Sequence, residues 1–398
     1  MDRKDQFQGL NYKKEILPYM EEYYNGTMFD RFTGGPDSAI YVKRLDTGAG
    51  DDIVYNQRQN FDPTIKIGNE RLLEAEDKLT YGVERVRVGF FRFGTRITNR
   101  DLQELQINHK FTPDIRAQLL WQGQKVNTDR MMRQFGLAFA DNVTRDKPNQ
   151  EWSYSELVEK MMACGIDEFK NGEAISRSRV MFGLDKGLDK DEVNLALNVA
   201  TMDDADADTL TVDHIFKLAD LAGKGSRTNV ANKEHAIRPY KVGNNRMGFP
   251  NRKYLLLTSS DAYFKLSKDP AWVSQMSRGV IEQEEQPSIL FGSNYKGTVH
   301  GVMVVTIPEF SNYVFDNGAG MTCGYSCLLG AGAIGLGIGQ NPHFATESWD
   351  YEMHHGFAHI EISGAKVLKF PSKIDLSQKG VNKLRVENGM IHSFVRLN

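Results

Sequence analysis

Cysteine is scarce in this chain of 398 residues. The three cysteines, Cys164, Cys323 and Cys327, are an odd number that cannot complete a disulfide framework, and such low use is typical of a reducing compartment. Cys323 and Cys327 also lack the second pair or the clustered histidines that a four-ligand zinc site needs. The sequence therefore predicts neither structural disulfides nor a structural metal.

An excess of one charge and long apolar runs are missing as well. Lys+Arg number 49 and Asp+Glu 52, a formal net charge of −3, which is too balanced for a protein whose main partner is nucleic acid. No run approaches the roughly 20 apolar residues of a membrane span, and the N-terminus lacks the apolar core of a signal peptide. We expect a protein that contacts no membrane and stays in the cytoplasm where it is made.

What the sequence does contain is typical of a folded chain with more than one packed unit. Hydrophobic residues make up 40% and charged residues 25%, close to the globular average. The length allows two or three lobes. Helical and strand-like patterns alternate without a regular βαβ rhythm, which favours the α+β class over a doubly wound sheet.

The first 60 residues show no sustained period and predict an extended arm. This arm carries too many aromatic residues for a solvated tail, so we expect it to bury them against another surface. An alternative is that the arm is a strand docked on its own domain. The aromatic residues are Tyr19, Tyr23, Tyr24, Phe29 and Phe32.

Residues 61–100 predict a long hairpin. Ile65 and Ile67 alternate with polar residues, Val86, Val88 and Phe90 do so later, and a charged stretch separates the two runs. Two strands of about a dozen residues would give a ribbon near 40 Å long, which is marginal in water and needs a supporting surface. A neighbouring molecule is one support, and an internal hairpin remains the alternative.

A long helix is predicted next. Pro113 precedes a helical pattern over 114–139, which at about 1.5 Å per residue spans roughly 39 Å and suits a spine laid across a sheet. Shorter helices are predicted at 154–169, 189–201 and 212–222, and strands at 254–257, 298–307, 357–370 and 390–397.

One motif suggests an enzyme. Gly330, Gly332 and Gly335 match a dinucleotide-binding fingerprint, with Asp350 placed where a ribose-binding acid sits. Dinucleotide binding needs a stable helix after the glycines, because the N-terminus of that helix holds the pyrophosphate. Each of Gly335, Gly337 and Gly339 would destabilise such a helix by about 1 kcal/mol. Too few residues follow Asp350 for the rest of a dinucleotide domain. We therefore interpret the segment as small residues that permit close backbone packing.

Two other clusters are weak candidates for metal binding. One cluster contains the histidines His354, His355 and His359. They precede or enter a predicted strand in which positions 355 and 359 share a face but lie apart along it, so we interpret all three as surface or interface histidines. Asp203–Asp208 lacks the glycine and the bidentate glutamate of a calcium loop, so we interpret it as a solvated acidic linker. No nucleophile elbow, HExxH helix or P-loop is present, and we predict no catalytic, cofactor or metal site.

Three stretches together resemble the major capsid proteins of tailed phages, whose Hong Kong 97-type fold is shared with encapsulins. They are IGNERLLEAEDKLTYGVERVRVGFFRFGTRITNRDLQEL, ILFGSNYKGTVHGVMVVTIPEF and LLGAGAIGLGIGQNPHFATESWDYEMHHGFAHIEISGAKVLKF. The resemblance implies an N-terminal arm (1–60), an extended hairpin loop or E-loop (61–100), a peripheral domain with the spine helix (101–222, with 142–208 interpreted as an insertion), an axial domain (223–345) and strands returning to the peripheral domain (346–398). Residues 223–252 match nothing in that family.

The same resemblance implies a structural function. The chain is expected to form pentamers and hexamers of an icosahedral shell, assembled in the host cytoplasm with a separate scaffolding protein, a portal and in some phages a cement protein, and to enclose DNA non-specifically in the virion. Lys78, Arg85 and Arg87 are the candidates for ion pairs between subunits. The alternatives are an NAD-dependent oxidoreductase using Gly330, Gly332 and Gly335, and an encapsulin-like compartment.

Overall fold

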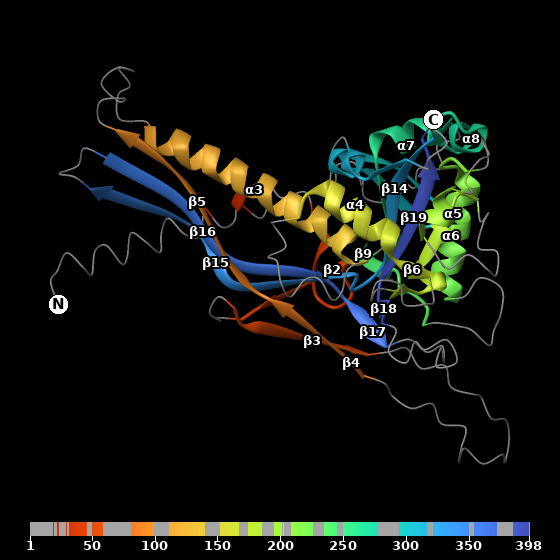
Figure 1. Ribbon diagram of the computed structural model, residues 1–398, viewed down its shortest axis with the longest axis horizontal. Helices are drawn as coiled ribbons and strands as arrows, with labels where there is room; N and C mark the ends of the chain where they lie inside the picture. The colour runs from red at the N-terminus through yellow and green to blue at the C-terminus, as the bar shows by residue number, and fades with distance from the viewer. Residues whose placement is uncertain are drawn as a thin grey trace, which may run out of the picture.

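The molecule is elongated, with a long helix lying along long strands at one end and a lobe of shorter elements at the other (Figure 1). The computed structural model describes residues 19, 22–23, 29, 32–45, 50–58, 81–98, 111–139, 152–166, 174–184, 195–200, 202, 208–225, 235–244, 250–277, 294–316, 321–349, 354–371 and 385–397. Within these ranges no helix is long and apolar enough to cross a membrane.

Five strands in the order β1-β2-β15-β16-β5 form what we call the spine sheet. Its centre is an antiparallel hairpin of β15 (Ile334–Trp349) and β16 (His354–Val367). On one side β2 (Ile40–Arg44) runs parallel to β15, followed by the short β1 (Thr33–Gly34). On the other side β5 (Gly89–Thr98) pairs antiparallel with β16.

Helix α3 (Phe111–Leu137) covers one face of the spine sheet. Its buried residues recur at helical spacing, and in the second half of the helix Met132 and Phe135 join the main apolar core. The spine helix predicted for 114–139 is thus present. It begins three residues earlier, and Ala138 and Phe139 form a turn that ends it.

The opposite face of the spine sheet carries a two-stranded ribbon. Strands β3 (Asp52–Arg58) and β4 (Tyr81–Arg87) pair antiparallel over their whole described length. Ile53, Tyr55 and Val86 of the ribbon are buried in a small core of their own with Val88 and Leu368. The described part of the ribbon is therefore supported by its own chain.

The predicted hairpin differs from the observed ribbon in two respects. The partner of β4 is β3, which the sequence analysis had assigned to the arm, whereas residues 63–67 lie outside the described residues. The run through Val86, Val88 and Phe90 is also two strands. Val88 exchanges backbone hydrogen bonds with Gly50 and Asp51, and this contact ends the ribbon before the chain joins β16 as β5.

Glycines on β15 and β16 make room for the ribbon. A Cβ atom on Gly335 would lie 2.8 Å from Leu368, and one on Gly337 would lie 2.9 Å from Ile53. A Cβ on Gly364 would meet the carbonyl oxygen of Arg87 at 2.1 Å. At Gly364 the clash is with the ribbon's backbone, so a larger residue there would force the ribbon and the sheet apart.

The lobe is built around a second sheet, the lobe sheet, in the order β11-β12-β10-β14-β19-β8. The strands are β8 (Val180–Phe182), β10 (Pro250–Thr258), β11 (Tyr295–Val299), β12 (Val302–Thr306), β14 (Thr322–Leu329) and β19 (Met390–Arg396), with β9 (Tyr240–Asn244) beside β10 and β13 (Val314–Asp316) beside β14. The buried strand predicted at 254–257 is present within β10. The segment predicted as one strand at 298–307 is instead part of a tight hairpin, because the chain turns at His300 and Gly301 between β11 and β12.

Helices surround the lobe sheet: α4 (Tyr154–Ala163), α5 (Leu195–Ala200), α6 (Val212–Lys224), α7 (Ser260–Leu266) and α8 (Pro270–Ser277). Local sequence explains their ends. Ser153 and Glu156 form a capping box on α4, Thr211 caps α6, and Gly225 adopts the left-handed conformation that ends α6. Helix α4 is shorter than predicted because Cys164 turns into the extended strand β6 (Gly165–Ile166).

Each sheet takes strands from more than one of the predicted domains. Strand β19, from the predicted return segment 346–398, is hydrogen-bonded between β14 and β8 in the lobe sheet, and β8 comes from the predicted peripheral domain 101–222. Residues 334–345, from the predicted axial domain, begin β15 of the spine sheet. The chain therefore crosses between the two sheets more often than the sequence pattern shows.

Candidate functional site

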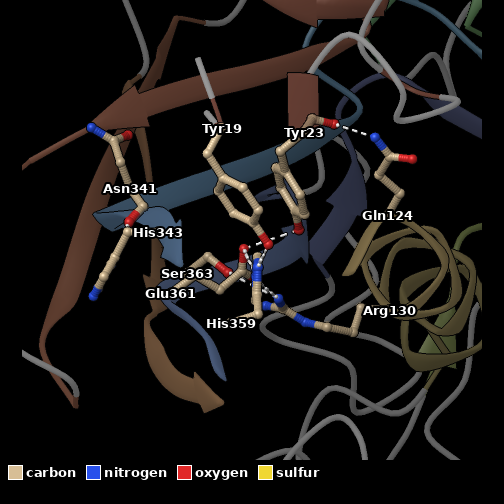
Figure 2. Close-up of polar contacts among 9 residues, drawn as sticks. All are labelled: Tyr19, Tyr23, Gln124, Arg130, Asn341, His343, His359, Glu361 and Ser363. Atoms are coloured by element: carbon tan, nitrogen blue, oxygen red, sulfur yellow. Dashed lines mark hydrogen bonds and ion pairs between the residues drawn. The ribbon is translucent and has the colours of Figure 1, made fainter. Parts of the chain in front are cut away.

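A buried polar cluster joins the N-terminal arm to the spine (Figure 2). We call it the arm cluster. The arm contributes two phenol groups, α3 contributes a guanidinium group, and β16 contributes an imidazole, a carboxylate and a hydroxyl group. The members are Tyr19, Tyr23, Arg130, His359, Glu361 and Ser363.

An ion pair lies at the centre of the arm cluster. Arg130 Nη1 is 2.7 Å from Glu361 Oε1, and both side chains are 7% exposed. The Ser363 hydroxyl donates to the same carboxylate oxygen at 2.9 Å and accepts a hydrogen bond from Arg130 at 2.9 Å. Burial alone would raise the pKa of Glu361, but the contact with His359 and the charge of Arg130 outweigh it and hold this pKa at about 2. The carboxyl group is therefore charged at neutral pH.

The arm is held by the two tyrosine hydroxyl groups. Tyr23 donates to Glu361 Oε2 at 3.0 Å, and the Tyr19 hydroxyl is 2.7 Å from His359 Nδ1. Gln124 of α3 adds a hydrogen bond to the backbone carbonyl of Tyr23 at 3.3 Å. Burial raises the pKa of Tyr19, so its hydroxyl keeps its proton.

Aromatic packing encloses these polar groups. The imidazole of His359 stacks on Phe93 of β5 with ring centroids 4.8 Å apart, and the guanidinium of Arg130 lies 3.6 Å above the Phe91 ring. Gly123 of α3 leaves space for Tyr23, because a Cβ atom there would lie 3.0 Å from its ring. The first 60 residues thus bury two of their aromatic side chains on the chain's own spine.

The interpretation of the histidines is wrong for one of the three. His359 is 1% exposed and belongs to the arm cluster, because it faces α3 from the middle of β16. His354 and His355 are half-buried at the start of that strand. Among the described residues no group of three His, Cys, Asp or Glu side chains could hold a metal ion. The arm cluster can fix the arm through hydrogen bonds and charge.

Sequence reasoning did not find Arg130 or Glu361. The sequence did contain one signal for Glu361. In the alternating strand predicted at 357–370, Glu361 and Ser363 lie on the buried face, and a buried charged residue needs a partner. Arg130 carries no comparable signal, because its partner lies 231 residues away in the chain.

The predicted intersubunit residues lie on the ribbon. Arg85 and Arg87 are exposed on the side of β4 that faces away from the spine sheet, whereas Lys78 lies outside the described residues. Val54 and Val83 share this outer side and are 40% and 51% exposed. The outer side of the ribbon is therefore a mixed basic and apolar surface.

A second buried charge fixes the root of the ribbon. Glu84 of β4 is 3% exposed and accepts a hydrogen bond from Lys366 of β16 at 2.6 Å. Arg385 of β18 (Arg385–Glu387) forms an ion pair with the same carboxylate and donates to the carbonyl of Val83. One carboxylate therefore links β4 to β16 and β18 and holds the described ribbon against them.

The glycine motif is a crossing between the two sheets. It connects β14 to β15, so a strand follows the glycines where a dinucleotide site needs a helix. The backbone N–H groups of residues 330–334 all donate to carbonyl groups of the chain, at 2.7 to 3.3 Å, and leave none for a phosphate. Gly330 is pressed against Arg238, whose carbonyl oxygen would lie 2.5 Å from a Cβ atom. The packing interpretation of this motif is confirmed, and Asp350 lies outside the described residues.

The three cysteines and Asp208 of the acidic segment are buried. None of the cysteines forms a disulfide bond, and burial raises the pKa of Cys323 to about 11. Asp208 is the described member of the acidic segment 203–208. It is buried rather than solvated, and its carbonyl accepts a hydrogen bond from the backbone of Arg396.

The order of arm, ribbon, long helix across a sheet, and lobe defines the Hong Kong 97-type fold. Comparison with solved structures bears this out. The chain aligns with the cyanophage Pam1 capsid at a TM-score of 0.64 and 16% identity, covering 93% of this chain and 92% of that chain. The Ralstonia phage GP4 capsid aligns at a TM-score of 0.63 and 17% identity, covering 93% of this chain and 91% of that chain. The acid-stable capsid of Helicobacter pylori bacteriophage KHP30 aligns at a TM-score of 0.56 and 12% identity, covering 93% of this chain and 90% of that chain.

No family model matches the chain, and the search of curated proteins finds no match. At 12 to 17% identity the likeness to these capsids concerns the fold.

Proposed function

We propose that the chain is a major capsid protein, a subunit that assembles into the icosahedral shell of a tailed phage. The observation that carries the proposal is the likeness to phage capsid chains over nearly the full length of both partners. A shared domain inside an unrelated protein would leave a large part of one chain unmatched. The proposed role is structural and involves no catalytic step.

The surface of the molecule supports this role. Large apolar side chains are exposed on the ribbon, the long helix and the lobe, including Val83, Trp121 and Phe264, each more than half exposed. In the proposed shell these side chains are candidates for contacts with neighbouring subunits. We assign the lobe after about residue 252 to the symmetry axis of each pentamer or hexamer, and the spine to the contacts between them.

The ribbon is the proposed site of ion pairs between subunits. Arg85 and Arg87 are exposed and form no ion pair with a described acid, and Lys78, the third candidate, lies outside the described residues. Replacing Arg85 and Arg87 by glutamate should lower the yield of assembled particles without unfolding the subunit. Replacing the exposed lobe residues Arg238 and Arg252 by glutamate changes the net charge equally and is the matched control.

Other partners follow from the same proposal. Identical subunits in pentamers and hexamers need slightly different contacts, so we propose that a separate scaffolding protein sets the curvature, with a portal at one vertex and in some cases a cement protein outside. The net charge of −3 suits non-specific enclosure of DNA. Assembly takes place in the host cytoplasm and the product is part of the virion.

Expression of the chain alone, followed by size-exclusion chromatography and negative-stain imaging, tests the proposal. We expect rings, sheets, tubes or particles of mixed size. A well-behaved monomer or dimer would overturn the capsid function, and uniform closed shells would overturn the need for a scaffold. Copurification of a cargo enzyme would favour the encapsulin-like alternative.

A further inference from the structure

Helix α3 belongs to both parts of the molecule (Figure 1). Its middle is fixed to the spine sheet, where Arg130 bonds to Glu361 of β16. Its last turns enter the main core beside the lobe, where Phe135 packs on Phe310 with ring centroids 5.4 Å apart. At about 1.5 Å per residue, the step from Arg130 to Phe135 spans roughly 8 Å. The helix thus passes from the spine to the lobe within less than two turns.

The hydroxyl group of Tyr313 lies against the helix backbone in this stretch. Tyr313 follows the short 3-10 helix η6 (Pro308–Asn312) of the lobe and is fully buried. Its hydroxyl donates to the carbonyl of Met132 at 2.8 Å. Burial raises the pKa of Tyr313 well above its ordinary value, and a hydrogen bond from the backbone of Gly136 acts in the opposite direction. One phenol oxygen thus contacts a backbone acceptor and a backbone donor four residues apart.

Met132 and Gly136 are partners that a regular helix joins directly, because the N–H of each residue donates to the carbonyl four residues earlier. A side chain that inserts into this ladder is one of the causes of a bend in a long helix. Gly136 leaves room for the phenol, since a Cβ atom there would lie 3.0 Å from the Tyr313 hydroxyl oxygen. A side chain of the lobe therefore takes part in one step of the ladder of the long helix.

A second side chain holds the end of the same helix. Lys369 of β17 (Lys369–Pro371) is buried and donates to the carbonyl of Ala138 at 2.6 Å. A cation at this end of a helix bonds the last carbonyl groups and interacts favourably with the helix dipole. The lobe is also attached to the spine by backbone bonds, such as Gly332 N–H to the carbonyl of Ser38 at 2.8 Å. Tyr313 and Lys369 can therefore be changed without touching those backbone bonds.

We propose that Tyr313 and Lys369 are positioning residues that set the angle between spine and lobe, and that this angle determines the curvature of the assembled shell. The inference rests on the proposed capsid function. Hinges are a few residues at the ends of elements, and packed cores favour discrete arrangements over continuous deformation. A subunit whose helix end is held at two points takes few angles, among which the scaffolding protein selects. Loss of either bond widens that range.

The range of angles can be measured in the unassembled subunit. Spin labels on Gln122→Cys of α3 and Ser260→Cys of α7, both exposed positions, report the distance between spine and lobe. Tyr313→Phe should roughly double the width of the distance distribution. Tyr154→Phe is the matched control, because its hydroxyl bonds the side chain of Asp129 on the same helix at 2.7 Å and its ring lies 5.2 Å from that of Tyr313. Equal widths in the wild type and Tyr313→Phe overturn the inference.

Assembly of the full-length chain tests the consequence for the shell. Tyr313→Phe should form particles in wild-type yield but with roughly double the spread of diameters in negative-stain images, whereas Tyr154→Phe should match the wild type. Lys369→Met should act in the same direction as Tyr313→Phe. Met132 and Gly136 can bond each other once the hydroxyl is gone, so Tyr313→Phe should keep its thermal transition.

Three other outcomes overturn the inference. Loss of the thermal transition in Tyr313→Phe would show that the hydroxyl is needed for folding and that its role is not one of positioning. A wide distance distribution with an unchanged spread of diameters would separate the angle from the curvature and leave the capsid function standing. If the wild type forms no assembly at all, the capsid function fails and the link to curvature fails with it, while the label distances still decide whether Tyr313 sets the angle.

Discussion

Removal of Glu361 should destabilise the subunit more than removal of Glu361 and Arg130 together. The two side chains form the buried pair of the arm cluster at 2.7 Å. Glu361→Gln leaves the guanidinium group in the interior without a countercharge, which costs about 3 to 5 kcal/mol in comparable buried pairs. Replacing both residues by methionine removes both charges and keeps apolar volume, so its cost should be smaller than that of either single change.

The pKa of Glu361 gives a second estimate of the same magnitude. A fall from 4.5 to about 2 corresponds to roughly 3 kcal/mol of stability at neutral pH. Because the folded-state pKa is the lower one, this contribution is complete above about pH 4.5 and is lost as the pH falls toward 2. Between pH 5 and pH 3 the wild-type subunit should lose about 2 kcal/mol that the double methionine variant does not lose.

Urea unfolding of the unassembled subunit, followed by circular dichroism at pH 7, 5 and 3, measures both effects. The wild type, Glu361→Met, Arg130→Met and the double methionine variant complete a mutant cycle, and Glu361→Gln is measured beside them. Equal pH dependence of the wild type and the double variant would refute the role assigned to the pair. So would a Glu361→Gln variant within about 0.5 kcal/mol of the wild type, because a buried charge would then have lost its partner at no cost.

Three further predictions concern the arm, the crossing and the ribbon. Tyr23→Phe removes a donor to a charged carboxylate and should lower subunit stability by about 1.5 to 3 kcal/mol in urea unfolding, whereas the control Tyr263→Phe should not. Gly332→Val places a branched residue at φ 64° and should lower the free energy of unfolding by about 1 to 3 kcal/mol. Isothermal titration should find no NAD binding to the wild type or to this variant. Unchanged stability would contradict the packing role. Deleting residues 72–80 should leave the thermal transition of the subunit intact while electron microscopy finds no closed shells, and loss of that transition would place the deleted residues in the subunit's own core.

The elements with strong local patterns could be predicted from the sequence. The long helix was predicted because Pro113 lies near its start and apolar residues such as Ile115, Leu119 and Phe135 recur near one face. The strand Tyr254–Leu257 was predicted because four large apolar residues follow each other. Strand β3 was missed, since its buried residues Ile53 and Tyr55 alternate for too short a distance beside a segment rich in glycine and aspartate. The break between β4 and β5 at Val88 could not be predicted, because it is made by backbone hydrogen bonds and these leave no side-chain pattern in the sequence.

The candidate site was less accessible to sequence reasoning. Arg85 and Arg87 could be selected because strand alternation separates them from Val86 and Val88. The arm cluster could not, because its members come from three distant segments and meet only when β16, α3 and the arm are in place. The same limit explains the error at His359, whose burial depends on α3 and β5 rather than on its neighbours in the chain.

The parallel pairing of β2 with β15 affects how the protein is made. Ile40 lies opposite Ile334, so β2 emerges from the ribosome almost 300 residues before its partner. At about 5 to 20 residues per second, the translation of that interval takes roughly 15 to 60 seconds. Throughout this time β2 and the arm exist without the sheet that holds them, and such non-local pairing also slows the folding that follows. The spine sheet can therefore form only after nearly the whole chain is synthesised, so an incomplete chain lacks the surface on which the arm is held.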